Sequence, residues 1–316
     1  MNILGFDIGG TKCAVILGKW NDGNIGICSK NVLPNDLSVS PFKIIDKLCE
    51  FADLMLDGIN PDAIGVSCGG PLDSTLGVIK EPPNLPGWKD INIVEILQKR
   101  YGVPAHLQND ANACAVAEWK FGAGKGFKNI VFLTFGTGLG AGLILDGHLY
   151  AGTNDMGGEV GHIRLDTFGP VGFGKRGSFE GFCSGNGIAQ LGYTMANEQV
   201  QSGNRPLYFP IGAKAEDITA KSIAEAAYAG DSTAIEVYKT CGEYLGKGLA
   251  VIIDILNPEK IIIGSIFSRS HDLLWASAKK VIDKEALPQA ASCCQVTPAV
   301  LGESIGDYAA LATALL

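Results

Sequence analysis

The stretch FDIGGTKCAVIL (residues 6–17) decides our interpretation of the fold. An apolar run from Ile3 to Asp7 ends in a carboxylate and two glycines, and a second apolar run, Cys13 to Leu17, follows at once. This pattern predicts a β-hairpin. Its bare turn leaves backbone N–H groups open to an anion such as phosphate, although a hairpin that needs glycine only for a positive φ would look the same.

The pattern returns at IVFLTFGTGLGAGLIL (residues 130–145), where Thr137 corresponds to Thr11. This second turn holds more glycines than a hairpin requires, and two such turns can grip a polyphosphate from both sides. A dinucleotide fingerprint fits less well, because the glycines of that motif open a helix and these lead into a strand. No G-x-x-x-x-G-K-[ST] phosphate loop is present.

Each half of the chain is a hairpin followed by helix and strand patterns. Apolar residues spaced three and four apart predict one helix from Pro41 to near Gly58 and another from Tyr238 to Leu256. A further helix follows residue 109 and stops at Gly122. Strands are expected in AIGVSCGGP (63–71), which runs into a glycine-proline turn, and in KIIIGS (260–265). We therefore predict an α/β fold of two related domains flanking a cleft, one formed by residues 1–119 with a C-terminal helix at about 303–316 and the other by residues 120–302.

Composition narrows the class of ligand. The net charge of −8 and the lack of a lysine or arginine cluster argue against nucleic acid as a partner. The apolar runs are too short to cross a membrane, and no leader pattern opens the sequence. Nine scattered cysteines without a C-x-x-C spacing favour free thiols in a reducing, cytoplasmic compartment. We expect a small-molecule ligand.

Five motifs together resemble the ROK family of sugar kinases and repressors. They occur in the family's order over nearly the whole chain: DIGGTK (7–12), NDANA (109–113), TFGTGLGAGLI (134–144), GGEVGH (157–162) and NPEKIIIG (257–264). The resemblance implies the actin-like, ribonuclease H-like ATPase fold, an ATP-dependent phosphorylation of a free hexose or N-acetylhexosamine with Mg²⁺, and a homodimer. It also implies a nucleotide site formed by Asp7, Gly9, Gly10, Thr11, Lys12, Gly136, Thr137, Gly138 and Gly264.

The resemblance assigns Asp110 as the general base that accepts the proton of the sugar hydroxyl. Without it, helix capping would be the simpler interpretation of Asn109 and Asp110, since both residue types are favoured there. A helix N-terminus would keep Asp110 ionised, as a weak base sufficient for a loose phosphoryl-transfer transition state. The residues implied for sugar binding are Gly70, Asn84, Asn109, Glu159, His162 and Glu180; glycine and asparagine at 70 and 84 also suit ordinary turns, and Trp88 suits packing.

The chain departs from its family at two places. Many members carry C-x-C-G-x-x-G-C-x-E after the Gly-His pair, and the cysteines join the histidine in a zinc site. Here Val171, Phe173 and Ser178 stand at the three cysteine positions, so we predict no structural zinc. We expect Val171 and Phe173 to hold the loop of residues 162–180 by packing, with Phe179 and Phe182 joining them. Ser265 stands where the family commonly has a second glycine after Gly264, which changes the expected contacts with the adenine ring.

Two other function classes stay open at this level. A sugar-responsive regulator of the same family would need a DNA-binding domain, for which the sequence offers no room before residue 7. An actin-like ATPase without a sugar substrate would share the glycine turns but not the sugar-side motifs.

Overall fold

The computed structural model describes all 316 residues, which form two compact units. Unit 1 comprises Met1–Phe132, Gly142–Gly158 and Val300–Leu316, and unit 2 comprises Leu133–Ala141 and Glu159–Ala299. These bounds differ from the predicted division after residues 119 and 302, because the hairpin of residues 130–145 is shared between the units. The domain division itself stays a prediction.

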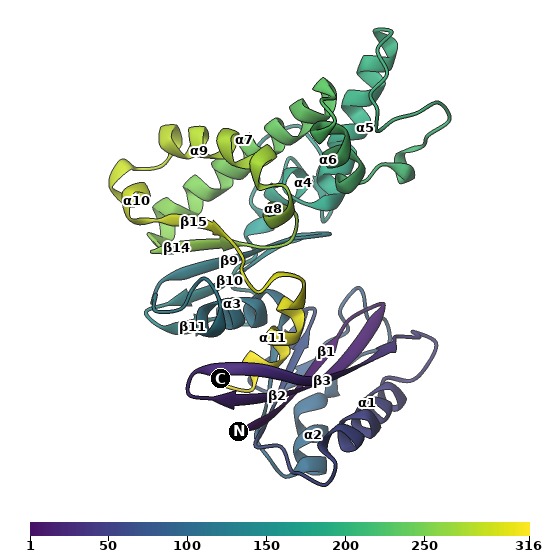
Figure 1. Cartoon of the computed structure of the whole chain (residues 1–316), viewed down its shortest axis with the longest axis vertical. Coiled ribbons are helices and arrows are strands. Elements are labelled where there is room, and N and C mark those ends of the chain that lie inside the picture. Colours follow the sequence, from purple (N-terminus) through teal and green to yellow (C-terminus); the bar gives the residue numbers. More distant parts are fainter. The chain divides into compact units, whose positions relative to one another are not determined.

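The first sheet has the strand order β3-β2-β1-β4-β8, and its strands β1, β2 and β3 are labelled in Figure 1. The predicted hairpin is confirmed, since β1 pairs antiparallel with β2 and β2 with β3, whereas β1 and β4, and β4 and β8, pair in parallel. The elements of this part of the chain are β1 (Asn2–Ile8), β2 (Lys12–Asn21), β3 (Asn24–Pro34), α1 (Pro41–Leu56), β4 (Ala63–Cys68), β5 (Leu72–Asp73), β6 (Val78–Ile79), β7 (Ile91–Asn92), α2 (Ile93–Tyr101), β8 (Ala105–Asn109) and α3 (Asp110–Phe121).

The second sheet repeats this order as β11-β10-β9-β14-β15. In each sheet three strands consecutive in sequence, the first of them central, are followed by two later strands, and β14 and β15 pair in parallel. The predicted recurrence is therefore confirmed. Its strands are β9 (Ile130–Phe135), β10 (Leu139–Leu145), β11 (His148–Tyr150), β14 (Lys260–Ile263) and β15 (Gln295–Pro298).

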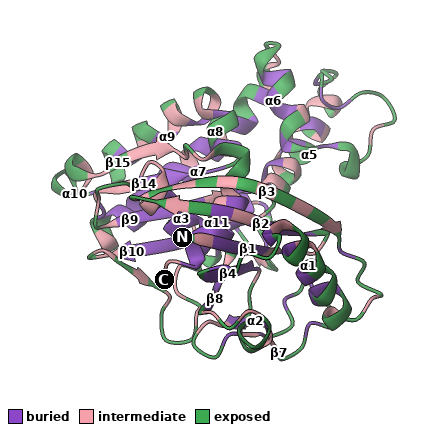
Figure 2. Cartoon of the chain, turned by 60° about the horizontal axis from the view of Figure 1, so that its bottom comes forward, coloured by how far each residue is buried: buried purple, intermediate pink, exposed green.

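Successive side chains along the strands of the first sheet point to opposite faces, and buried apolar residues form a hydrophobic core on each face. Leu4, Phe6 and Val15 pack with the buried side of α1, and Ile3 and Ile16 pack on the opposite face. β3 is nowhere fully buried, as its exposed and intermediate residues in Figure 2 show, which suits an edge strand.

The last helix of the chain, α11 (Ile305–Thr313), covers the face that α1 leaves open. A methyl group added to Gly65 of β4 would lie 2.1 Å from the Ala310 carbonyl oxygen, and one on Gly5 would lie 3.0 Å from the Ala310 Cβ. Glycines inside these strands therefore serve the close approach of a helix backbone.

The carboxylate of Glu118, in α3, is completely buried. Its Oε1 accepts hydrogen bonds from the N–H groups of Val300 (2.9 Å) and Leu301 (3.0 Å), and its Oε2 accepts one from Ala123 (2.7 Å). Three backbone donors satisfy the charge, so this side chain fastens α3 to the segment that leads into α11.

Unit 2 consists mostly of helices, together with β14, β15 and parts of β9 and β10 from the second sheet. Its long helix α7 (Ser232–Leu256) begins earlier than the predicted Tyr238, because Asp231 caps it by accepting from the Ala234 N–H. The other elements are η1 (Val160–His162), β12 (Val171–Gly172), β13 (Lys175–Arg176), α4 (Phe179–Phe182), α5 (Gly185–Gln201), η2 (Ala215–Asp217), α6 (Ala220–Tyr228), α8 (Ile266–Arg269), α9 (His271–Glu285) and α10 (Pro288–Cys293), with η3 (Gly302–Ser304) preceding α11 in unit 1. None of the helices combines the length and apolar character needed to cross a membrane.

We expect Glu118→Gln to lower the free energy of unfolding by about 2–4 kcal/mol, because an amide presents a donor to at least one of the three N–H groups and loses the charge. Urea denaturation measures the change. Glu225→Gln, at an exposed position of α6, is the matched control and should change stability by less than about 0.5 kcal/mol. A loss below about 1 kcal/mol at position 118 would contradict the proposed fastening role.

Candidate functional site

The first glycine turn is braced by a residue that the sequence did not point to. The Gly9 N–H donates to the Lys12 carbonyl (3.1 Å), and Asn35, just after β3, donates from its backbone to the Thr11 carbonyl (2.9 Å) and from its amide to the Gly9 carbonyl (2.7 Å). The Thr11 and Lys12 side chains stay exposed. The turn is thus fixed from behind, with its polar side chains free to meet a ligand.

Asn84 limits the space beside Gly10. A Cβ at Gly10 would lie 2.5 Å from the Asn84 carbonyl oxygen, and a Cβ at Gly69 would lie 3.2 Å from the Asn84 Oδ1. Asn84 therefore joins the turn to the segment containing Gly70, whose own Cβ position meets no other atom within 4 Å. Trp88 is buried, which confirms its packing role.

Asp7, at the end of β1, lies in a cluster of charged groups. Burial and the neighbouring Asp307 raise the pKa of Asp7 from 3.8 to about 6, against the opposing effect of Lys30. Lys30 Nζ pairs with Asp307 Oδ1 at 2.6 Å, and the first turn of α11 approaches Asp7 so closely that a Cβ on Gly306 would lie 3.6 Å from its Oδ2. No local sequence pattern indicates this ion pair, because β3 and α11 are far apart in the chain.

Asn109 and Asp110 open α3. The Asn109 Oδ1 accepts from the Asn112 N–H (2.8 Å), so Asn109 is the helix cap, and its Nδ2 remains available to another partner. The Asp110 Oδ1 accepts from the Ala111 N–H (2.8 Å). Asp110 is accessible to solvent at its surface, yet the protein atoms around it remove enough solvation to raise its pKa. The loss of solvation thus opposes the effect of the helix N-terminus on this carboxylate, and the role of Asp110 as a base stays a prediction.

The second glycine turn lies in unit 2, and its glycines also differ from one another. At Gly136 an added Cβ would meet only the Ser265 Oγ, at 3.8 Å, so this backbone is open to a ligand. At Gly138 the same Cβ would lie 2.8 Å from the Glu180 carboxylate. Thr137, between them, is exposed.

Gly264 follows β14 and donates its N–H to the Leu133 carbonyl (3.0 Å), three residues before Gly136. The next residue, Ser265, has φ 52° and ψ −112°, a backbone conformation that glycine adopts more readily than serine. Ser265 therefore stands at a position where the family commonly has glycine and where the backbone conformation of this chain still favours glycine.

Glu180 links the predicted sugar ligands of unit 2 to the second glycine turn. Its Oε2 accepts from the Leu139 N–H at 3.0 Å, and Ser178 caps the helix that carries it by accepting from the Gly181 N–H. A Cβ on Gly161 would lie 2.1 Å from the Leu139 carbonyl oxygen, so η1, with Glu159 before it and His162 at its end, packs on the same residue.

The packing expected of Val171 and Phe173 is wrong, because both side chains are exposed, Phe173 over 79% of its surface. The two-residue strands β12 and β13 form a hairpin too short to cover its own tip. Phe179 and Phe182 are buried as expected, and the Phe182 ring stacks on the Tyr244 ring (3.4 Å between centroids, 3° between planes).

Polar contacts hold the rest of this loop. The Gln190 side chain forms two hydrogen bonds with the backbone of Val171, accepting from its N–H (3.0 Å) and donating to its carbonyl (2.9 Å). Lys175 Nζ donates to the His162 carbonyl (2.7 Å). No group of three or more His, Cys, Asp or Glu side chains is arranged to hold a metal. The residues present do not fit the family's zinc site.

The predicted site residues thus form two sets, each gathered within one unit. Unit 1 holds Asp7, Gly9, Gly10, Thr11, Lys12, Gly70, Asn84, Asn109 and Asp110; unit 2 holds Gly136, Thr137, Gly138, Glu159, His162, Glu180 and Gly264. Their roles remain predictions.

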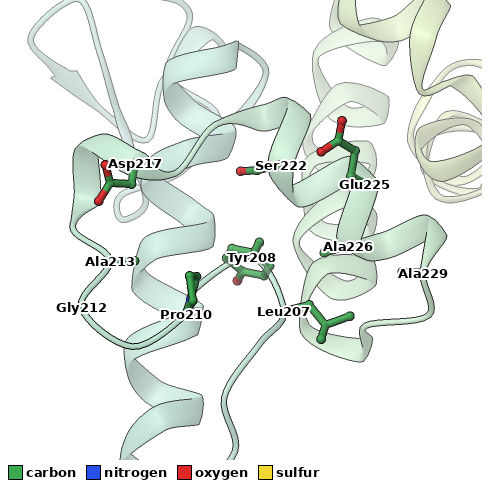
Figure 3. A pocket seen from close by; sticks show the side chains of 10 residues that line it. All are labelled: Leu207, Tyr208, Pro210, Gly212, Ala213, Asp217, Ser222, Glu225, Ala226 and Ala229. Carbon is green, nitrogen blue, oxygen red and sulfur yellow. The ribbon is translucent and has the colours of Figure 1, made fainter.

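A separate pocket of about 610 Å³ lies under the loop that joins α5 to α6 and contains none of these residues (Figure 3). Its polar side chains serve local structure: Ser222 completes the capping of α6 with Thr219, and Asp217 accepts from the Lys214 N–H (2.9 Å). With two carboxylates and no basic group in its lining, this pocket does not suit a phosphate.

A model described as the ROK family matches residues 3–315. The chain belongs to the ROK family. It is 30% identical to a glucokinase of Thermotoga maritima over 97% of this chain and 95% of that protein. A ROK family glucokinase of Streptomyces griseus, solved in complex with glucose and AMPPNP, has a TM-score of 0.78, 28% identity and coverage of 100% of this chain and 99% of its own.

The family also contains regulators. The xylose repressor of Bacillus spizizenii is 28% identical over 76% of this chain and 58% of the repressor. The solved ROK kinases share the mixed α/β architecture described above, which confirms the predicted actin-like α/β fold.

We expect Asp7→Asn to stabilise the protein at pH 8. The folded pKa of Asp7, about 6, exceeds its ordinary 3.8, so folding disfavours the ionised form and stability falls as pH rises through this window. After allowance for solvent screening, the variant should gain about 1–2 kcal/mol at pH 8 and less than about 0.5 kcal/mol at pH 4, where the folded carboxyl is protonated and the unfolded one is roughly half protonated. Urea titrations at both pH values measure this, with Asp22→Asn, an exposed position, as the control. A variant less stable than the parent at pH 8 would contradict the burial effect.

We expect protein purified without a chelator to contain substoichiometric zinc, because the 162–180 loop is held by Gln190, Lys175 and the Phe182–Tyr244 stack. Elemental analysis measures the metal, and thermal unfolding with and without EDTA should give the same midpoint. Stoichiometric zinc, with stability lost on chelation and restored by zinc, would refute this.

Proposed function

We propose that the protein is an ATP-dependent sugar kinase that phosphorylates a hydroxyl of a free hexose or N-acetylhexosamine. The observation that carries the proposal is Asp110, a carboxylate of raised pKa held at the start of α3 beside an Asn109 amide with free donors. The glucokinase relative that spans nearly the whole chain supports the same reaction class.

Asp110 acts in this proposal as the acceptor of the sugar hydroxyl proton. Its Oδ1 is oriented by the Ala111 N–H, which fixes the carboxylate for alignment with the attacking hydroxyl. A raised pKa brings the acceptor closer to neutral pH and makes proton transfer more favourable than for an ordinary aspartate. Alignment supplies most of the effect, because the phosphoryl-transfer transition state is loose.

Sugar hydroxyls need groups that both donate and accept hydrogen bonds. The Asn109 amide is a donor, whereas the Glu159 and Glu180 carboxylates are acceptors and the His162 ring can supply either, depending on its tautomer. We assign the sugar to these side chains together with Asn84 and the open backbone at Gly70. In unit 2 the Leu139 N–H holds the Glu180 carboxylate, so that ligand is set before the sugar arrives.

The two glycine turns are assigned to ATP. Thr11 and Lys12 supply exposed polar groups on one, and Gly136 and Thr137 supply open backbone and a hydroxyl on the other, with Gly264 on the adenine side. Asp7 fits Mg²⁺, because a partly desolvated carboxylate of raised pKa beside other carboxylates is stabilised by a cation. When bound, Mg²⁺ would neutralise charge that develops on the phosphates.

A panel assay tests the reaction. Glucose, mannose, fructose, allose, N-acetylglucosamine and N-acetylmannosamine are each incubated with ATP, and ADP release is followed with and without Mg²⁺. Sugar-dependent ADP release supports the kinase. ATP turnover that ignores every sugar would favour an actin-like ATPase, and sugar binding without turnover would favour a regulator of the kind represented among the relatives.

We expect Asp110→Asn to lower kcat with the preferred sugar by a factor on the order of 10² to 10⁴, the usual range for the loss of a positioned base. The fold should be retained, since asparagine is accepted in the first turn of a helix and a partly desolvated charge is removed. Steady-state kinetics and thermal unfolding measure both. Asp57→Asn, at the left-handed cap of α1, is the control, and near-parental kcat for Asp110→Asn would remove Asp110 from the mechanism.

A further inference from the structure

Phe173 occupies a position that folding alone would give to another residue. It forms the tip of the β12–β13 hairpin with Gly174, and both have a positive φ, 43° and 73°. Hairpin turns with two left-handed residues favour Asn-Gly, and a bulky aromatic residue in this region is strained. Phe173 is also 79% exposed, so little burial of its side chain offsets the cost of the strained backbone.

The hairpin does not need the ring for its stability. Gln190 holds Val171 through two hydrogen bonds, and Ser178, Phe179 and Phe182 anchor the chain that follows β13 in the buried part of unit 2. An exposed aromatic ring on an otherwise secured, strained turn is the kind of outlier that points to a ligand rather than to packing.

The neighbour of this ring is one of the proposed sugar ligands. The Phe173 and His162 rings lie 6.4 Å apart between centroids at 76°, and Lys175, the residue after Gly174, donates to the His162 carbonyl at 2.7 Å. His162 is exposed, so its ring and the Phe173 ring are accessible to a ligand side by side.

We infer that Phe173 is a specificity residue that packs against the C–H face of the sugar bound at His162, an inference that rests on the proposed kinase function. A pyranose ring carries hydroxyls at its edge and C–H groups on its faces, so a complete site needs hydrogen-bonding partners together with an apolar wall. The polar ligands of unit 2 supply the first and Phe173 supplies the second.

Phe173→Asn is the decisive variant, because asparagine suits the turn better than phenylalanine and keeps the hairpin formed. We expect equal or higher thermal stability, a KM for the preferred sugar raised roughly 5- to 20-fold, and a KM for ATP within about twofold of the parent. Calorimetric titration with the sugar alone should show the same loss of affinity.

Two further variants separate a sugar contact from a structural role. Phe173→Tyr restores an aromatic face and should return the sugar KM to within about threefold of the parent. Phe168→Ala removes another exposed phenylalanine of the same loop, 63% exposed, and should leave the sugar KM unchanged.

The outcomes also separate this inference from the proposed function. If the parent phosphorylates a sugar and Phe173→Asn keeps the parental KM and affinity, the inference is overturned while the kinase assignment stands. An equal rise in the KM values for sugar and ATP, or a loss of thermal stability, would show a structural role and overturn it as well. If the parent phosphorylates no sugar, the kinase assignment fails first.

Discussion

The buried carboxylate of Glu118 is the interaction on which the proposed chemistry of unit 1 depends. Glu118 lies in α3, the helix that begins at Asp110, and its three backbone donors lie just after that helix and at residues 300–301. From Leu301 the chain turns into α11, which sets Asp307 beside Asp7. The Glu118 side chain therefore connects two helices. One is α3, which carries the proposed base Asp110, and the other is α11, which places Asp307 beside the proposed metal ligand Asp7.

The sequence predicted the elements well where local pattern and tertiary structure agree. The two apolar runs around the glycine turn predicted the strands β1 and β2, and apolar residues three and four apart predicted α1. The recurrence of the glycine-containing hairpin predicted the second sheet. It failed where the cause lies elsewhere in the chain. Asn84 and Glu180 occupy the space beside Gly10 and Gly138, and no local pattern reveals these two contacts. Apolar character alone suggested that Val171 and Phe173 are packed, whereas burial depends on a second layer that the short hairpin lacks.

Several features that disfavour folding gather among the candidate site residues. Asp7 and Asp110 are partly desolvated carboxylates, and Ser265 and Phe173 have backbone conformations better suited to glycine or asparagine. Such conflicts between local preference and structure are expected where selection has favoured binding over stability. The well-packed cores on both faces of the first sheet supply the stability that offsets them.

The close contact of α11 with β1 and β4 also bears on how the protein is made. Residues 159–299 separate this helix from the preceding part of unit 1, and their synthesis takes roughly 7 to 30 s at about 5–20 residues per second. Throughout that interval the face formed by Ile3, Ala14, Ile16 and Ala63 lacks its cover. On the ribosome, this face of unit 1 is thus an exposed apolar surface until all of unit 2 and the last residues of the chain have been synthesised.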